Sequence, residues 1–228
     1  MDQNNKNWDR EYRNPVFLSK SEKPRKDLVE FFRYLKKSGF EVEGKNFLDL
    51  GTGTGRNAFF MAQKGMKGVG IDVSQTAIDI AQKRLLTETY DIDFKVGDMG
   101  QKFQYPDNSF DIVVDILSSN SLDESGREMY VSETKRVLKT GGHMLIIALC
   151  KDGDQNAKEL LKKFPGKEKD TYILAETGIC ERVFTKEDFI NTYASNFKIL
   201  ELKKKTNYTR FNNKSYKRNF WIAYMQKI

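Results

Sequence analysis

The sequence has few of the residues that form covalent frameworks and metal sites. It contains two cysteines, four prolines and a single histidine in 228 residues. Cys150 and Cys180 are too few for a disulfide framework, and they do not form a Cys-x-x-Cys pair. Because no cluster of cysteine and histidine is present, we expect no metal ion, and we interpret His143 as a structural residue.

Long apolar runs are also missing. No run approaches the roughly 18 residues that a membrane-spanning helix needs, and the polar N-terminal stretch MDQNNKNWDREYRN does not resemble a secretory signal. We therefore expect a cytoplasmic protein with no membrane partner. The sequence leaves the oligomeric state open.

Excess positive charge is absent from most of the chain. The net charge is +7, but nine of the 39 Lys and Arg residues lie in residues 197–228, beside a single acid, Glu201. The predicted loop at 203–218, KKKTNYTRFNNKSYKR, interleaves bases with aromatic residues, a pattern that can bind phosphates and stack RNA bases. It can equally be a solvated hairpin whose lysines protect a sheet edge. We favour the hairpin, because the near-neutral body offers no basic path for a polymer.

Segments typical of strands and helices alternate along the chain. This alternation predicts an α/β fold: a single domain whose mostly parallel sheet has helices on both faces and an antiparallel C-terminal strand. We divide it into an N-terminal cap and first helix (1–44), a ligand-binding half (45–149), a substrate-cap insertion (150–184) and a C-terminal helix and strand pair (185–228). The predicted strands are 47–50, 68–73, 92–96, 110–116, 143–149, 197–202 and 219–226, and the predicted helices are 26–37, 56–64, 74–89, 123–138, 158–164 and 186–193.

Glycines at alternate positions follow the first predicted strand. Gly51, Gly53 and Gly55 differ from the dinucleotide fingerprint G-x-G-x-x-G, whose third glycine would fall at Arg56. Asp49, two residues before the first glycine, would repel a pyrophosphate but suits a cationic group. Ligands of open α/β sheets bind beyond the carboxyl ends of the strands, so this turn is the expected floor of a site.

Two further acids end the next two predicted strands. Asp72 lies at the distance from the glycines at which a carboxylate accepts hydrogen bonds from ribose hydroxyls. Asp98 could accept a hydrogen bond from an exocyclic amine. Together with Asp49, they describe a ligand that has an amino group, a ribose and an adenine but no phosphates.

At these residues the sequence resembles the class I S-adenosylmethionine-dependent methyltransferases. The matching motifs are LDLGTGTG (48–55), GIDVS (70–74), GDM (97–99), FDIVVD (110–115) and RVLKTGG (136–142). The resemblance implies a Rossmann-like, seven-stranded sheet, S-adenosylmethionine as cofactor and S-adenosylhomocysteine as product. The cofactor-binding residues that it implies are Asp49, Gly51, Thr52, Gly53, Gly55, Asp72, Val73, Asp98, Met99 and Asp115.

The acceptor of the methyl group is harder to identify. Methyl transfer is an in-line displacement that depends mainly on holding the acceptor about 3 to 3.5 Å from the carbon. Asp115, at the end of the fourth predicted strand, is the candidate catalytic residue, although it could also orient the cofactor or simply cap the strand. The candidate substrate-binding residues are Trp8, Tyr12, Ser118, Asn120 and Arg210.

Three functions follow from these expectations. The leading hypothesis is methyl transfer to O, N or S of a small molecule, because the chain is compact and its cap is short. The alternatives are an RNA methyltransferase that uses the 203–218 loop and a non-catalytic module that binds S-adenosylmethionine.

Overall fold

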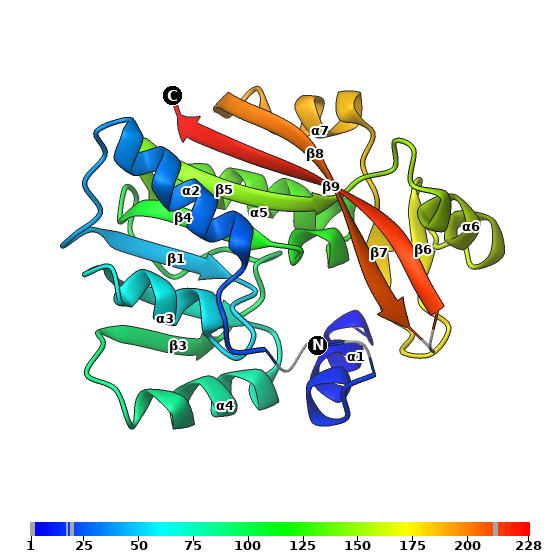
Figure 1. Cartoon of the computed structure of the whole chain (residues 1–228), viewed down its shortest axis with the longest axis horizontal. Coiled ribbons are helices and arrows are strands. Elements are labelled where there is room, and N and C mark those ends of the chain that lie inside the picture. Colours follow the sequence, from blue (N-terminus) through cyan, green and yellow to red (C-terminus); the bar gives the residue numbers. More distant parts are fainter. Residues whose placement is uncertain (1–2, 17, 19–20, 212–213) are drawn as a thin grey trace.

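Buried strands form the centre of the molecule, which we describe from a computed structural model for residues 3–16, 18, 21–211 and 214–228, without the side chains of 209–215. The seven-stranded sheet has the order β3-β2-β1-β4-β5-β9-β8. Strands β1 to β5 are parallel, and β9 is antiparallel to β5 and β8, which confirms the predicted fold class (Figure 1). The strands are β1 (Asn46–Leu50), β2 (Lys67–Asp72), β3 (Ile92–Val96), β4 (Phe110–Ile116), β5 (Leu138–Leu149), β8 (Phe197–Phe211) and β9 (Lys214–Lys227).

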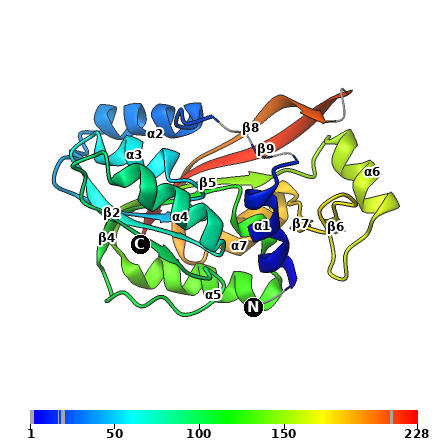
Figure 2. The same ribbon diagram turned by 90° about the horizontal axis from the view of Figure 1, so that it is seen from below.

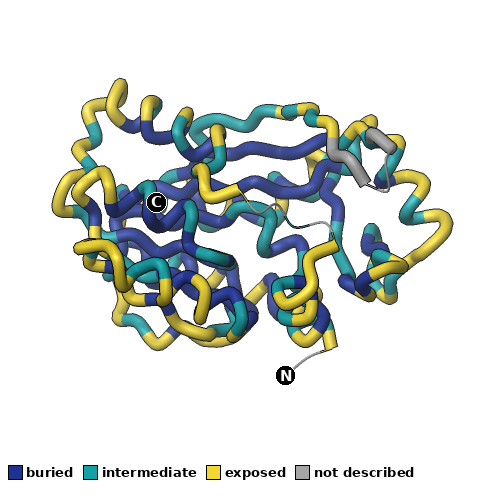
Figure 3. The backbone as a smooth tube through the Cα atoms, turned by 60° about the horizontal axis from the view of Figure 1, so that its bottom comes forward, coloured by how far each residue is buried: buried dark blue, intermediate teal, exposed yellow. Residues whose placement is uncertain are grey.

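Helices cover both faces of this sheet. α2 (Lys26–Lys37), α3 (Arg56–Ala62) and α4 (Gln75–Leu85) share one hydrophobic cluster with alternate residues of β4 such as Ile112. α5 (Glu124–Val137) and α7 (Lys186–Tyr193) share a second cluster with the intervening Val113. Alternate side chains of a strand point to opposite faces, which explains why β4 is buried over most of its length. Figure 2 shows α2 and α5 on opposite sides of the sheet, and Figure 3 shows the buried strands at the centre.

An additional helix, α1 (Gln3–Arg13), precedes the predicted first helix and was not predicted. Trp8 and Tyr12 are its only large apolar side chains, too few to form the apolar stripe that signals a helix. Its buried residues are the polar Asn7 and Glu11. Side-chain hydrogen bonds attach it to the rest of the fold: Asn4 donates to the carbonyls of Ser121 (2.8 Å) and Cys180 (3.2 Å).

The predicted loop at 203–218 is wrong, because β8 and β9 continue through it as one long hairpin. Their pairing extends from Phe197 with Lys227 to Phe211 with Lys214. β5 pairs with β9 only as far as Phe220, so the distal part of the hairpin projects beyond the sheet. This projecting part has no core to face, and its sequence therefore lacks the apolar alternation that identifies a strand.

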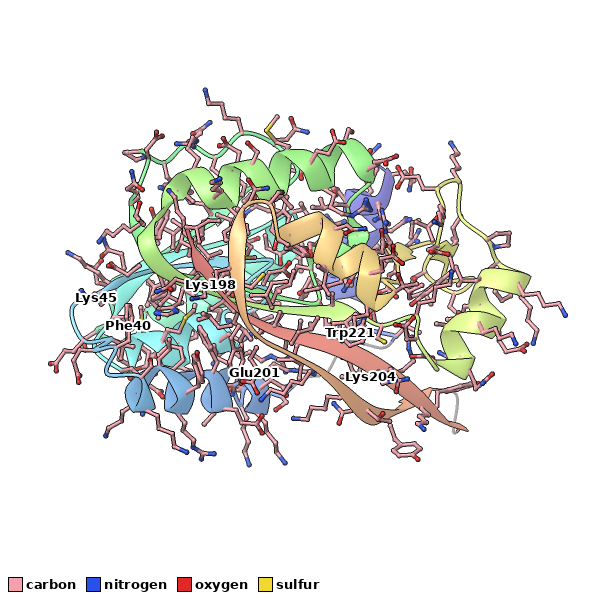
Figure 4. The ribbon with its side chains drawn as sticks, turned by 90° about the horizontal axis from the view of Figure 1, so that it is seen from above. Phe40, Lys45, Lys198, Glu201, Lys204 and Trp221 are labelled. Carbon is pink, nitrogen blue, oxygen red and sulfur yellow. The ribbon has the colours of Figure 1, made fainter. Side chains whose placement is uncertain are left out.

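Lysines lie along β8, the edge strand, as the hairpin alternative in the sequence analysis expects. Figure 4 shows Lys198, Glu201 and Lys204 along β8, and Trp221, which pairs with Lys204, on β9. Lys203 pairs with Glu201 at 3.0 Å, and Lys205 pairs with the buried Asp27 of α2 at 2.6 Å. Lysines on an edge strand oppose pairing with a second chain.

The expected cap insertion contains α6 (Gln155–Lys163) and a two-stranded sheet of β6 (Thr171–Ile173) and β7 (Cys180–Arg182). Asp154, whose side chain is fully buried, attaches this cap to the hairpin. Its Oδ1 accepts from the Ala157 amide (2.8 Å) at the start of α6, and its Oδ2 accepts from the Asn219 amide (2.7 Å). Arg218 lies 3.5 Å from the same carboxylate. Across the described part of the chain, no helix has the length and apolar character of a membrane span.

Replacing Asp154 should destabilise the protein far more than replacing another helix-capping aspartate. Asp154→Ala removes a cap, leaves the buried Asn219 amide without its partner and takes the nearest carboxylate away from Arg218, which costs about 2 to 4 kcal/mol of the free energy of unfolding. Asp123→Ala removes the exposed cap of α5, whose carboxylate accepts only from neighbouring residues of its own turn, and costs about 1 kcal/mol. Urea unfolding of both variants measures the difference, and equal losses would contradict the role of Asp154.

Candidate functional site

A cavity of about 620 Å³ opens at the carboxyl ends of the parallel strands. The loops after β1, β2, β3 and β4 form its floor, while α1 and the cap contribute to its walls. Its size is typical of a small-molecule site. Lining residues from the floor include Gly51, Thr52, Gly53, Asp72, Val73, Gly97, Asp98, Met99, Leu117 and Ser118, and those from the walls include Asn5, Trp8, Tyr12, Arg25, Arg56, Glu181 and Phe220.

The glycine loop brings backbone close to other parts of the floor. Gly51 has φ 70°, and a Cβ atom there would lie 2.0 Å from Oγ of Ser118. Gly53 has φ 56°, and a Cβ atom there would lie 2.6 Å from the Tyr12 hydroxyl. Side chains are thus excluded at both positions by conformation and by space. The loop presents bare backbone to the cavity, as the sequence predicts.

Asp72 joins the glycine loop to the end of β2. One carboxylate oxygen accepts from the Gly53 amide and the other from the Ser74 amide, each at 2.9 Å. Burial raises the pKa of Asp72 to about 6. Each oxygen retains a lone pair toward the cavity, so the carboxylate can still accept from two vicinal hydroxyls.

Asp98 lies at the end of β3 with both oxygens engaged. Oδ1 accepts from the Gly100 amide at 2.8 Å, and Oδ2 accepts from the side-chain amide of Asn5 at 3.0 Å. The Asn5 amide is the same kind of donor as the exocyclic amine of adenine. Met99 and Val73 add apolar surface beside it, so this part of the floor suits a flat, amine-bearing ring.

Asp49 lies beneath the loop and does not line the cavity. It is 1% exposed, and its carboxylate accepts from the Thr52 hydroxyl at 2.7 Å. Burial raises the pKa of Asp49 to about 7. Its carboxylate faces Thr52 and not the cavity, and its role as a cofactor-binding residue stays a prediction. Gly55 also lies outside the lining. A Cβ atom there would lie 2.7 Å from the Phe94 ring.

Asp115 also lies outside the lining, and its catalytic and cofactor-binding roles stay predictions. It is fully buried, behind the lining residues Leu117 and Ser118, and burial raises its pKa. Its carboxylate accepts from the Tyr130 hydroxyl (2.8 Å) and the Ser118 amide (3.0 Å). Because these partners hold the loop after β4 in place, Asp115 acts as a positioning residue in this structure.

The candidate substrate residues have different positions. Trp8, Tyr12 and Ser118 line the cavity. Asn120 does not, because it is 1% exposed and its side-chain oxygen accepts from the Leu149 amide at 3.0 Å. The side chain of Arg210 lies outside the described residues.

Three arginines that line the cavity were not predicted from the sequence: Arg25, Arg56 and Arg84. Burial and then the proximity of Arg25 lower the pKa of Arg56. Arg56 forms no salt bridge with any residue that the structure describes, so it is available to an anion. In the sequence, Arg56 stands out only because it takes the place of the third glycine of the dinucleotide fingerprint. Arg25 belongs to a segment without apolar periodicity. In residues 3–16, 18, 21–211 and 214–228, no group of three metal-ligating side chains comes together.

Comparison with known proteins gives a consistent result. A family model for a methyltransferase domain matches residues 47–142. Phosphoethanolamine N-methyltransferase 1 of Arabidopsis thaliana is 35% identical over 112 residues, covering 47% of this chain and 22% of that protein. An uncharacterized methyltransferase of Schizosaccharomyces pombe is 30% identical over 104 residues, covering 46% of this chain and 71% of that protein.

A solved structure matches a larger part of the chain. A SAM-dependent methyltransferase from Methanosarcina mazei superposes with a TM-score of 0.71 at 25% identity, covering 82% of this chain and 93% of that one. The chain spans only about a fifth of the length of the Arabidopsis relative.

Substituting Gly51 should impair the site much more than substituting a glycine of equal conformation elsewhere. Gly51→Ala forces the Ser118 loop to move and should weaken binding of S-adenosylmethionine at least about tenfold. Gly141→Ala is the matched control, because Gly141 has φ 74° and nothing lies within 4 Å of an added Cβ. Calorimetry and thermal unfolding of both variants test this; equal losses of affinity would contradict a close approach at Gly51.

Proposed function

The chain belongs to the class I S-adenosylmethionine-dependent methyltransferases, and from this premise we propose that it transfers a methyl group to a small-molecule acceptor. The observation that supports this most is the meeting of three features in one cavity. The bare glycine loop, the Asp72 carboxylate and the Asp98 carboxylate all lie on its floor.

The residues of the cavity fit the cofactor. Asp72 would accept from the ribose hydroxyls, and Asp98 with Met99 would hold the adenine, with the Asn5 amide giving way to the exocyclic amine. Arg56, which has no acidic partner among the described residues, would pair with the cofactor carboxylate. Bound S-adenosylmethionine supplies the methyl group as part of a sulfonium cation, whose charge the buried Asp49 and Asp72 stabilise.

The chain itself contributes mainly position and exclusion of water. Asp115 and Tyr130 fix the loop that carries Leu117 and Ser118, and these two residues face the acceptor. Trp8 and Tyr12 of α1 close the cavity from the other side. Holding the acceptor in line with the methyl carbon supplies most of the acceleration that such a reaction needs.

A small acceptor is favoured over RNA by the charges of the hairpin. Lys203 and Lys205 are already paired with acids, which reduces the net positive surface offered to a polymer. The Arabidopsis relative, by its name, methylates phosphoethanolamine, which is a small molecule.

We also keep the predicted division into a cofactor-binding half (45–149), a substrate cap (150–184) and a C-terminal unit (185–228). The low cysteine content favours a reducing, cytoplasmic location.

Binding and turnover together test this function. Calorimetry with S-adenosylmethionine should show 1:1 binding, and Asp72→Asn should weaken it at least about tenfold, because a neutral amide is a poorer acceptor for two hydroxyls. Asp79→Asn, on the exposed side of α4, is the matched control and should bind like the wild type. A screen of amines, thiols, alcohols and carboxylates then measures methyl transfer. Failure of the wild type to bind the cofactor would refute the proposal; binding without any turnover would favour a non-catalytic module.

Cofactor affinity should depend on pH more strongly than product affinity. With the pKa of Asp49 at about 7 and that of Asp72 at about 6, lowering the pH protonates both carboxyls in the free protein. A sulfonium cation favours their ionised forms, so its binding must expel those protons. S-adenosylhomocysteine has an uncharged sulfur. Between about pH 8 and about pH 6, the affinity for S-adenosylmethionine should therefore fall by about tenfold relative to the affinity for S-adenosylhomocysteine. Calorimetry at several pH values measures the ratio, and a constant ratio would contradict the electrostatic role of these two acids.

A further inference from the structure

Glu181 of β7 is an acid of the cavity wall that the cofactor does not explain. The other acids that line the cavity are Glu22, Asp72 and Asp98. Asp72 and Asp98 belong to the proposed cofactor site, and Glu22 is largely exposed beside Arg84 at 3.9 Å. Glu181 comes instead from the cap and is half-buried.

A buried chain of polar groups holds this carboxylate in position. Tyr172 donates its hydroxyl hydrogen to Oε2 of Glu181 at 2.7 Å, and Arg218 donates to the same hydroxyl oxygen at 2.7 Å. Arg218 also lies 3.5 Å from Asp154, so its guanidinium meets one carboxylate directly and is linked to Glu181 through the Tyr172 hydroxyl. The cluster therefore carries one net negative charge, and Glu181 is the member of it that reaches the cavity.

The cavity that Glu181 lines also has apolar walls. Trp8, Leu117, Leu122 and Phe220 line the same cavity. A carboxylate that faces a cavity with such walls gains most from a ligand that brings its own positive charge or N–H donors. Aromatic rings at the same site also favour cationic nitrogen over a neutral hydroxyl.

We propose that Glu181 binds the nitrogen of an amine acceptor and thereby makes this protein selective for amines over alcohols, thiols and carboxylates. The inference rests on the proposed function and adds the substrate class. Tyr172 acts as a positioning residue, because it links Glu181 to Arg218 without reaching the lining of the cavity.

Methyl transfer to an amine needs no reagent besides the amine and the cofactor. An amine bound as the ammonium first loses a proton to water. The lone pair of the neutral amine then forms the bond to the methyl carbon while the electron pair of the carbon–sulfur bond remains on sulfur. The methylated nitrogen then carries a surplus proton, which passes to water. Glu181 stabilises the positive charge that develops on this nitrogen.

Ligand binding tests the proposal independently of turnover. Ethanolamine and benzylamine are titrated into the wild-type protein with and without saturating S-adenosylhomocysteine, each against the alcohol of the same carbon skeleton, ethylene glycol and benzyl alcohol. At least one amine should bind about tenfold or more tightly than its alcohol. Glu181→Gln should abolish this preference while leaving the affinity for S-adenosylhomocysteine unchanged.

Two control variants separate the role of Glu181 from general effects. Glu176→Gln removes a charge from an exposed position of the same cap and should keep the amine preference. Tyr172→Phe removes the supporting hydrogen bond and should weaken amine binding less than Glu181→Gln does. Wild-type protein that binds alcohols as well as amines, or a Glu181→Gln variant that retains the preference, would overturn the proposal. Failure of the wild-type protein to bind the cofactor would instead refute the proposed function. The titrations without S-adenosylhomocysteine would still decide the role of Glu181.

Discussion

The Asp72 carboxylate is the contact on which the site depends. It accepts from the amide of Gly53 in the loop after β1 and from the amide of Ser74 at the start of α4. The amides of Gly51 and Thr52 meanwhile donate to the Ile71 carbonyl, just before Asp72, each at 2.9 Å. The end of β2 thus determines the path of the glycine loop, and that path brings Gly51 against Ser118 of the loop after β4. One buried acid that lines the cavity thus links the ends of β1 and β2 directly.

The sequence predicts this arrangement well where local chemistry determines it. Strands β3 and β4 and helices α2 and α7 have the predicted bounds, because apolar periodicity and residues typical of helix ends define these elements locally. Asp72 and Asp98 lie in the cavity because the carboxyl ends of parallel strands meet at one edge. The same rule overreaches at Asp49 and Asp115. It assigns a residue to a strand end, but it does not distinguish a side chain that faces the ligand from one that faces the protein.

The remaining parts could not be predicted, since they depend on contacts between distant segments. α1 has only Trp8 and Tyr12 as large apolar side chains; it is attached by hydrogen bonds such as those of Asn5 to Asp98 and of Trp8 to Ser121 (3.0 Å). The distal hairpin is a pair of strands because β8 and β9 satisfy each other's backbone groups, not because either strand has a buried face. Glu181 has no motif at all, and only the folding of the cap brings it to the cavity. The residues nearest the acceptor are thus the ones that local sequence pattern describes least.

The burial of Asp115 changes how the chemistry of the site should be understood. A carboxylate that accepts from Tyr130 and from two loop amides is already satisfied, and moving it into the cavity would leave those donors without a partner. Its contribution is therefore the fixed shape of the wall formed by Leu117 and Ser118. An in-line displacement needs such a wall more than it needs a strong base, because the sulfonium leaving group is already activated. The acid of the cap that can influence the acceptor is Glu181, so the cap, rather than the geometry of the strand ends, governs which molecule is methylated in the mechanism that we propose.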